Sequence, residues 1–178
     1  MTSEAVRYRA ATPNDAQALA RLAEEAFVAA FGTLYQPHDL ATFLETERSE
    51  SRYQTHLRDP ATRIQLAERD GVLAGYALIV MGKAFAERPA PRPARPVMLS
   101  QLYCLPTATG SGIGRALLDW AIAEARGWGA DAVQLSVYSD NTGAQRFYRR
   151  HGFTHVADMH FMVGDHRDDE FLYERALG

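Results

Sequence analysis

Three closely spaced glycines between an extended apolar segment and an amphipathic helix constrain the fold of this chain most. Gly110, Gly112 and Gly114 follow the apolar segment 97–105. The apolar residues that recur with helical period from there on are Ile113, Ala116, Leu117, Trp120 and Ala121. The first N–H groups of a helix lack intrahelical partners and glycine has no Cβ, so an anion can approach the backbone there. The order of strand, glycine loop and helix predicts an α/β fold with an anion-binding junction.

Other interpretations of the glycine loop differ in how well the sequence supports them. Glycines also serve turns that bind nothing. A P-loop would need Gly-Lys-Ser/Thr, which is absent, so an ATP or GTP hydrolase has little support. A dinucleotide fingerprint is closer, but Arg115 stands near its third small position and Asp131 precedes the next strand instead of ending it. A nucleotide-binding oxidoreductase stays a minor alternative.

Hydrophobic periodicity predicts alternating strands and helices along the remaining chain. Its 178 residues have the usual length of one domain, spanning 1–178. We expect a first strand around Tyr8, a helix from Thr12 to Gly32, and short helices at 40–44 and 53–57. Asp70 and Gly71 form a turn pair between two apolar runs, which predicts a hairpin. A proline-rich surface loop at 89–96, a strand at 133–137, a helix after 141 and two closing strands complete a mixed α/β sheet.

Composition and charge exclude several classes of partner. The chain is 47% hydrophobic and 23% charged, the balance of a globular protein. Its longest mainly apolar run, 72–82, is well short of the ~18–20 residues that a membrane span needs. Residues 1–5 do not resemble a secretory signal, so we expect a cytoplasmic protein. A net charge of −3 gives no reason to bind nucleic acid or anionic lipid, which favours a small-molecule partner.

The last predicted helix presents three residues on one face. Asn141, Ala144 and Tyr148 are spaced i, i+3 and i+7, so a ligand lying along that face would meet all three. Taken alone, Asn141 is also a common helix cap and Tyr148 a common core aromatic. Together with the glycine loop, the three residues favour a binding site.

Three segments in this order resemble the GNAT superfamily of acetyl-CoA-dependent N-acetyltransferases. They are LYCLP at 102–106, GSGIGRALL at 110–118 and NTGAQRFYRRHGF at 141–153. The resemblance implies a mostly antiparallel twisted sheet of about six to seven strands flanked by about four helices. It also implies acetyl-CoA as co-substrate and no metal. Further likeness at 161–165, Asp169, Phe31 and Tyr35 points to bacterial polyamine acetyltransferases.

The resemblance assigns roles to particular residues. The strand end 102–105 would pair with the pantetheine arm, the loop 110–116 would hold the pyrophosphate, and Asn141 would bond the cofactor chain. Tyr148 would act as general acid for the departing thiolate, and a backbone N–H near Leu102 or Tyr103 would bind the acetyl oxygen. The predicted cofactor-binding residues are Leu102, Tyr103, Cys104, Leu105, Gly110, Ser111, Gly112, Ile113, Gly114, Arg115, Ala116, Asn141, Ala144 and Tyr148, with Tyr148 and Tyr103 also catalytic.

Two departures from the family pattern leave roles open. Thr109 stands where relatives often carry Gln or Arg, which removes one expected phosphate contact. Met98 and Ser100 occupy strand positions where many relatives carry a glutamate that helps to deprotonate the amine. A water chain past Ser100, Gln101 and Tyr103 is our expectation for the missing base, and an acid of the first helices, such as Glu24 or Glu25, is the alternative.

The remaining candidates favour structural roles. Cys104 lies in an apolar strand and is expected to be a buried thiol. His151 and His155 have the spacing of a metal pair, but Gly152 interrupts their helix. Residues 164–169 predict a hairpin loop, and Arg88, Arg92 and Arg95 a solubilising surface. The acids of the first helices outnumber the bases and would favour a cationic acceptor if they lined its site; otherwise they form a solvated helix face.

The sequence as a whole predicts direct acetyl transfer to the primary amine of a small molecule, with a polyamine as one version. The competing acceptors are a protein N-terminus and a lysine side chain. An alternative of another class is a catalytically weak acetyl-CoA-binding sensor, because the usual glutamates are missing. The family resemblance also leaves a homodimer open.

Overall fold

A computed structural model describes residues 5–178 and arranges seven strands in one sheet. Residues 1–4, which carry most of the expectation about a secretory signal, lie outside the described residues. The strands are β1 (Arg7–Ala10), β2 (Thr62–Arg69), β3 (Val72–Met81), β4 (Pro96–Cys104), β5 (Ala132–Tyr138), β6 (Thr154–Val163) and β7 (His166–Ala176). Their order in the sheet is β1-β2-β3-β4-β5-β7-β6, and β4–β5 is the parallel pair among antiparallel neighbours.

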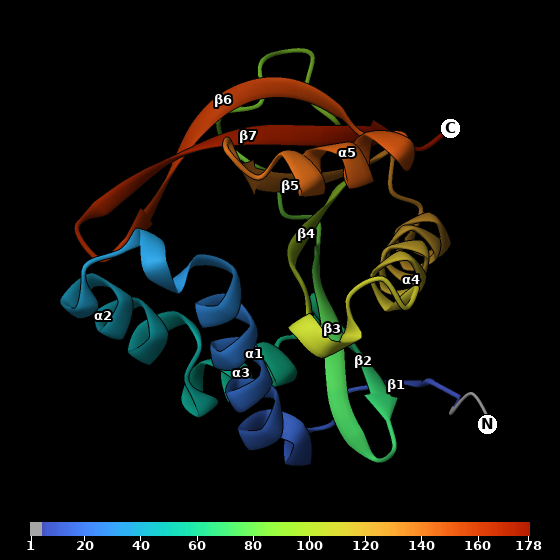
Figure 1. Cartoon of the computed structure of the whole chain (residues 1–178). Helices are drawn as coiled ribbons and strands as arrows, with labels where there is room; N and C mark the ends of the chain where they lie inside the picture. The colour runs from blue at the N-terminus through green and yellow to red at the C-terminus, as the bar shows by residue number, and fades with distance from the viewer. Residues whose placement is uncertain (1–4) are drawn as a thin grey trace.

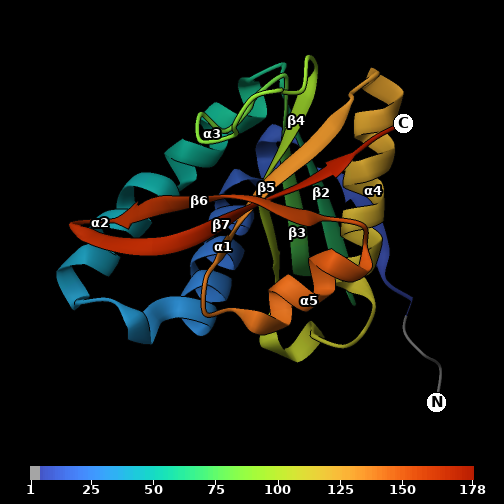
Figure 2. The same ribbon diagram turned by 90° about the horizontal axis from the view of Figure 1, so that it is seen from above.

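Helices cover the two faces of this sheet (Figure 1). They are α1 (Ala16–Phe31), α2 (Pro37–Glu47), α3 (Glu50–Arg58), α4 (Ile113–Trp128) and α5 (Thr142–Arg150), with short 3-10 turns at Pro13–Asp15, Gly32–Leu34 and Pro106–Ala108. α1 and α3 pack on one face of the β2–β4 region, whereas α4 packs on the other face. Figure 2 shows α2 beneath the far end of the long β6–β7 ribbon, where α2 contacts β6. The expected fold class is therefore confirmed.

The first helix and the first hairpin form for the reasons that the sequence indicated. α1 buries one apolar stripe that includes Leu19, Leu22 and Phe27. Its start is later than expected, because Pro13–Asp15 forms a 3-10 turn first and the Asp15 carboxylate accepts the N–H of Thr12 at 2.7 Å. Asp70 and Gly71 have φ values of 55° and 74°, the left-handed conformation that a two-residue hairpin turn requires.

The expected loop at 164–169 is wrong in its length. β6 ends at Val163 and β7 begins at His166, so only Gly164 and Asp165 form the turn. Asp168 belongs to β7, is 3% exposed and accepts a hydrogen bond from the Tyr35 hydroxyl at 2.5 Å. A run of charged residues suggested a loop, but alternate side chains of a strand face opposite sides and one of these acids is buried.

The arginines of the proline-rich loop are not all solubilising, as the sequence had suggested. Arg88 donates to both carboxylate oxygens of Glu174 at 2.8 and 2.9 Å. The Arg95 guanidinium lies 3.6 Å from the ring centroid of Trp128. The loop is thereby fastened to β7 and to the end of α4.

Among the described residues, none of the helices combines the length and apolarity needed to cross a bilayer.

Candidate functional site

The two central strands of the sheet diverge and open a cleft between them. β4 pairs with β5 only at residues 96–98, opposite 132–134. β4 nevertheless continues to Cys104 and β5 to Tyr138, and β5 pairs along its whole length with β7 on its other side. Among the residues that the structure places, the β4 backbone beyond Met98 therefore has one edge without a neighbouring strand. Such an edge offers N–H and C=O groups to an extended ligand.

A bulge in β4 decides which N–H groups face the open edge. The register against β3 shifts between Leu99 and Gln101, so Ser100 is the extra residue. Further along, the Leu105 N–H donates to Ala74 of β3 at 2.9 Å. Successive N–H groups of a strand alternate between its two edges, so the Leu102 N–H faces the open edge and the Tyr103 N–H faces β3. Of the two amides considered for the acetyl oxygen, the geometry favours Leu102.

The cleft has a volume of about 250 Å³ and draws its walls from distant parts of the chain. The lining residues from β4 and from the start and face of α5 are Leu99, Ser100, Gln101, Leu102, Tyr103, Cys104, Asn141, Ala144 and Tyr148. The others are Ala26, Phe27, Ala30, Phe31, Tyr35, Arg48, Leu135, Ser136, Val137, Tyr138, Phe161 and Glu170. Six residues predicted from the sequence thus lie around one cavity: Leu102, Tyr103, Cys104, Asn141, Ala144 and Tyr148.

The glycine loop lies next to this cleft, between β4 and α4. Gly110 and Gly112 have φ values of 75° and 84°, and a Cβ at either position would meet nothing within 4 Å. The glycines are therefore needed for left-handed backbone and leave open space above it. Gly112 directly precedes the first turn of α4, whose N–H groups have no intrahelical acceptors. Thr109 donates its hydroxyl hydrogen to Pro106 O at 2.7 Å, so that side chain is committed to the turn.

Other residues of the predicted phosphate loop lie outside the cleft lining. Ile113 is buried under α4, whereas Ser111 donates its hydroxyl hydrogen to Ala108 O. Arg115 is exposed, with its Nε 3.8 Å from an Asp119 carboxylate oxygen. Leu105, Gly114 and Ala116 complete the connection from β4 into α4. These residues surround the helix start, which suits a phosphate-bearing group extending from the cleft to solvent.

Asn141 and Tyr148 mark the two ends of the α5 face that lines the cleft. The Asn141 side-chain oxygen caps the helix by accepting the Ala144 N–H at 3.1 Å, which leaves its amide N–H groups for a ligand. Tyr148 is half-buried, and burial raises the pKa of its phenol above the ordinary value. Within residues 5–178 its hydroxyl makes no hydrogen bond. The phenol therefore remains protonated at neutral pH and is able to donate.

Three buried polar side chains beneath the cleft are hydrogen-bonded to one another. The Gln101 side-chain oxygen accepts the hydroxyls of Tyr53 and Tyr76, each at 2.7 Å. The two hydroxyls are also 3.1 Å apart. All three side chains are buried, and Tyr103 stacks on Tyr76 with ring centroids 6.0 Å apart. Of the three residues that the sequence analysis assigned to a water chain, Gln101 has its side-chain oxygen bound to these two tyrosines.

Two charged lining residues were missed by the sequence analysis. Arg48 directly follows α2 and is 7% exposed, and Glu170 belongs to β7. Burial raises the pKa of the Glu170 carboxyl; the Ser136 hydroxyl opposes this shift and the charge of Asp168 adds to it. Arg48 was counted only as one charge on a helix surface. Glu170 lies 22 residues after Tyr148 in a charged run, so no local motif marks it.

The acids proposed from the first helices do not lie in the cleft. Glu24 and Glu25 are exposed and border a separate shallow depression with Arg21 and Val28. Neither acid is therefore placed in the cleft to serve as the alternative base. α1 faces the cleft with its apolar side, including Phe27 and the small residues near it. The charge of the cleft comes from Arg48 and Glu170, not from the acids counted along the sequence.

The two histidines have the structural surroundings that the sequence favoured, whereas Cys104, expected to be buried, is half-buried and lines the cleft. Burial raises the pKa of the Cys104 thiol to about 11, so almost none is thiolate at neutral pH. His151 Nδ1 lies 2.8 Å from Phe147 O, and His155 Nε2 lies 2.9 Å from Asp158 Oδ1. Each histidine thus has its own partner, and the two do not form a pair.

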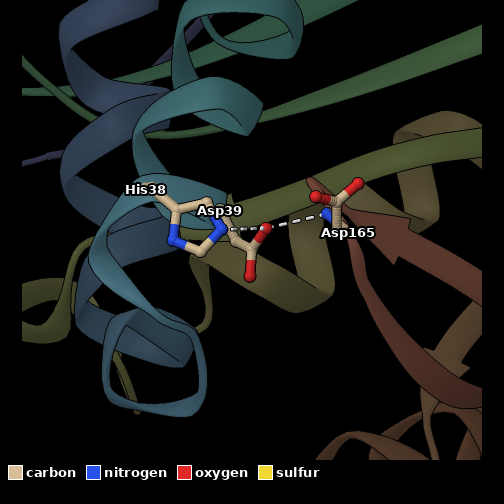
Figure 3. Close-up of side chains that lie close together, drawn as sticks. All are labelled: His38, Asp39 and Asp165. Carbon is tan, nitrogen blue, oxygen red and sulfur yellow. Dashed lines mark hydrogen bonds and ion pairs between the residues drawn. The ribbon is translucent and has the colours of Figure 1, made fainter.

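A group of ligand-type side chains occurs elsewhere, where α2 meets the β6–β7 turn (Figure 3). Ligand-type atoms of His38, Asp39 and Asp165 lie within 4.8 Å of one another. The buried Asp39 carboxylate accepts the Asp165 N–H at 2.8 Å and lies 3.2 Å from His38 Nε2. A Cβ at Gly164 would come within 2.5 Å of Asp39 Oδ1, so the turn approaches α2 closely enough to require glycine. We assign Asp39 to docking the turn on α2.

Comparisons with known proteins agree with this geometry. Residues 17–153 match the acetyltransferase (GNAT) family model. The chain is 34% identical to an uncharacterized N-acetyltransferase of Mycobacterium tuberculosis, over 92% of this chain and 98% of the relative. An aminoalkylphosphonate N-acetyltransferase of Salmonella typhimurium is 32% identical, over 62% of this chain and 68% of the relative.

A solved structure has the same fold. The PaiA N-acetyltransferase of Thermoplasma acidophilum in complex with coenzyme A superposes with a TM-score of 0.76, over 97% of this chain and 99% of that one, at 19% identity. The family match and the M. tuberculosis relative establish the assignment, and the structural likeness supports the fold. The chain belongs to the GNAT family of acetyltransferases and is an acetyl-CoA-dependent N-acetyltransferase.

Proposed function

We propose that this N-acetyltransferase moves the acetyl group of acetyl-CoA directly to the primary amine of a small molecule. The observation that carries the proposal is the cleft, which is lined by the open edge of β4, by Tyr148 and by Glu170. Its volume of about 250 Å³ and its aromatic walls suit a compact acceptor. The Salmonella relative, whose name specifies an aminoalkylphosphonate, also acts on a small amine.

The residues present fit acetyl-CoA. The unpaired β4 edge at Leu102 and Cys104 would bind the pantetheine amides, and the Asn141 amide would donate to the same arm. The loop from Gly110 to Ala116 would hold the pyrophosphate on backbone N–H groups at the start of α4. Acetyl-CoA supplies the acyl group, and the chain's residues position it against the acceptor. The Leu102 N–H would bind the acetyl oxygen, whose negative charge grows as the amine attacks.

Glu170 and Tyr148 would carry the proton transfers in the cleft. An alkyl amine has a pKa of ~10 and arrives as a cation, so a proton must leave before attack. Glu170, as the carboxylate in the cleft, would take that proton while the new N–C bond forms and the C–S bond breaks. Tyr148 would donate to the departing thiolate. Cys104 is poorly suited to carry the acetyl group, because its raised pKa keeps it a thiol, which supports direct transfer over a two-step route.

A polyamine is one version of the acceptor. It is supported by the likeness of residues 161–165, Asp169, Phe31 and Tyr35 to bacterial polyamine acetyltransferases. Phe31, Tyr35 and Phe161 line the cleft. The charge of the cleft, considered below, favours a different kind of amine.

The test of this function is thiol release from acetyl-CoA by the purified chain over a panel of primary amines, with Tyr148→Phe as the informative variant. We expect Tyr148→Phe to lower kcat about 10²-fold, because a general acid contributes on that order. Acetyl-CoA should still raise the melting temperature of the variant, since cofactor binding does not depend on the hydroxyl alone.

The matched control is Tyr8→Phe, which removes a hydroxyl from an exposed tyrosine on β1. It should turn over like the original protein. Unchanged kcat in Tyr148→Phe would remove Tyr148 from the chemistry. Acetyl-CoA binding without thiol release for any amine, peptide amines included, would favour a sensor over an enzyme of small amines.

A further inference from the structure

In the part of the chain that the structure describes, Arg48 is a buried cation that lines the cleft and has no carboxylate paired with it. Its guanidinium carbon is 4.9, 5.5 and 5.8 Å from the ring centroids of Phe43, Phe27 and Tyr103. NH1 donates to Glu47 O at 3.0 Å, whereas Nε is buried and has no hydrogen-bond partner. Across residues 5–178, no carboxylate forms an ion pair with Arg48; the neighbouring Glu47 carboxylate pairs with Arg52 instead, at 3.5 Å.

The protein alone provides few partners for the charge and the N–H donors of the Arg48 guanidinium. Arginine is always charged and presents five N–H donors in a planar fork that matches carboxylate and phosphate geometry. A buried charge without a partner is costly, and three aromatic rings compensate only in part. The rings do fix the position of the guanidinium at the cleft wall. The missing partner is therefore expected from a ligand that enters the cleft.

Glu170 provides the opposite charge in the same cleft. It comes from β7 and is not ion-paired with Arg48 among the described residues, so their charged atoms are more than 4.0 Å apart. Both residues line the cavity that also contains Tyr148. A ligand that satisfies both would carry a cation at one end and an anion at the other.

We propose that the acceptor is an amino-acid-like molecule, whose amine lies at Glu170 and whose carboxylate or phosphonate binds Arg48. This inference rests on the proposed function, because it names the acceptor class of that same site. A polyamine would instead bring its second cation towards Arg48, which is unfavourable in a buried site. The structure thus assigns Arg48 to the selection of the acceptor, separate from the acetyl-transfer groups.

The experiment compares zwitterionic amines with neutral amines of matched shape. Each ω-amino acid from glycine to aminohexanoate is measured against its amide, with aminoethylphosphonate and putrescine as further arms. The readout is the ratio of kcat/KM between each acid and its amide. We expect a preference of about 10- to 100-fold for the acid at the best chain length, as for a buried charge-assisted hydrogen bond. Comparing carboxylate with phosphonate identifies which anion fits the site.

Arg48→Met and Arg52→Met form the matched pair of variants. Arg48→Met should reduce the acid-to-amide ratio to about one, mainly through KM, while Arg52→Met, which removes an exposed arginine, should keep it. Replacing a buried charge by an apolar side chain of similar length is often tolerated, so the melting temperature of Arg48→Met should be retained. Glu170→Gln should lower kcat/KM for acids and amides alike and leave their ratio unchanged.

Several outcomes would overturn the inference. Equal kcat/KM for acids and amides, or a preference for putrescine, would show that Arg48 meets no anion. An equal loss for both substrates in Arg48→Met would identify a purely structural arginine. If no amine releases thiol, the proposed function fails instead. Binding then decides the inference: the acids should raise the melting temperature in the presence of acetyl-CoA, and Arg48→Met should abolish that rise. No rise in the unsubstituted protein would refute it.

Discussion

The two faces of the central strands bury different kinds of side chain. On the α4 face, β3 and β4 contribute aliphatic residues such as Ile79 and Leu99, which pack with Leu117 and Leu118. On the opposite face, the same strands place Tyr76, Gln101 and Tyr103 under α1 and α3, with Arg48 over the Tyr103 ring. The difference shows that the α4 face is mainly aliphatic packing, whereas the opposite face contributes buried polar side chains to the cleft.

The cost of substitution should differ between these faces. Aliphatic packing is non-directional, so a truncation lowers the free energy of unfolding by an amount that depends on the volume removed. A buried polar group depends on each partner being present, and losing one partner leaves another unsatisfied. The α4 face should therefore govern unfolding with little effect on acceptor choice, and the α1–α3 face should affect both.

The largest effect on stability is expected from Leu117→Ala on the α4 face. Leu117 is fully buried, so the substitution should lower the free energy of unfolding by about 2–5 kcal/mol through lost burial and the cavity left behind. Chemical denaturation measures this change. Val72→Ala, at a residue that is 66% exposed, is the control and should cost far less. If Leu117→Ala also shifted the acid-to-amide ratio, the separation between the faces would fail.

A smaller loss of stability is expected from Gln101→Leu on the opposite face. The substitution removes the acceptor of two tyrosine hydroxyls, which can still bond each other, so we expect a cost of about 1–3 kcal/mol. Activity should fall as well, because Gln101 lines the cleft. A double-mutant cycle with Tyr53→Phe measures the coupling. Additive effects in that cycle would contradict a connected network.

The smallest effect is expected at Cys104, which lies at the border of the two regions. Cys104→Ala should change kcat by less than about twofold, since the thiol has no chemical role in direct transfer. Its pKa is raised to about 11, so the thiolate fraction, and with it alkylation by iodoacetamide at pH 8, should be about 100-fold below that of an ordinary thiol. Mass spectrometry over a pH series tests this. Rapid labelling at pH 7 would contradict the expected burial.

Local sequence signals predicted most of the fold. The apolar period of α1, the turn pair at Asp70 and Gly71, and the cap at Asn141 each act within a few residues, so their patterns are visible in the sequence. The start of β7 was misjudged because its charged residues conceal a strand with one buried acid, Asp168. The buried Asp168 carboxylate accepts a hydrogen bond from Tyr35, which lies far away in the sequence, so no local pattern indicates it.

The sequence predicted only those site residues that belong to short contiguous motifs. Tyr148 and the residues near Leu102 were found because they lie in motifs, and they line the same cleft in the structure. Arg48 and Glu170 could not be found in this way, since their importance arises from tertiary burial and from the absence of a local partner. Glu24 and Glu25 were considered because the sequence shows their charge. It does not show that their side of α1 faces away from the cleft.

The contact between α2 and the β6–β7 turn has a consequence for the range of molecules that the cleft accepts. α2 leads into Arg48 and the β6–β7 ribbon includes Glu170, and Asp39 joins the two elements through Asp165 and Gly164. This contact, together with the packing of Phe43 on Phe161, helps to set the distance between the two charged residues. A longer β6–β7 turn should increase the distance between Arg48 and Glu170. The enzyme should then prefer longer acceptors, while the acetyl-transfer groups stay in place.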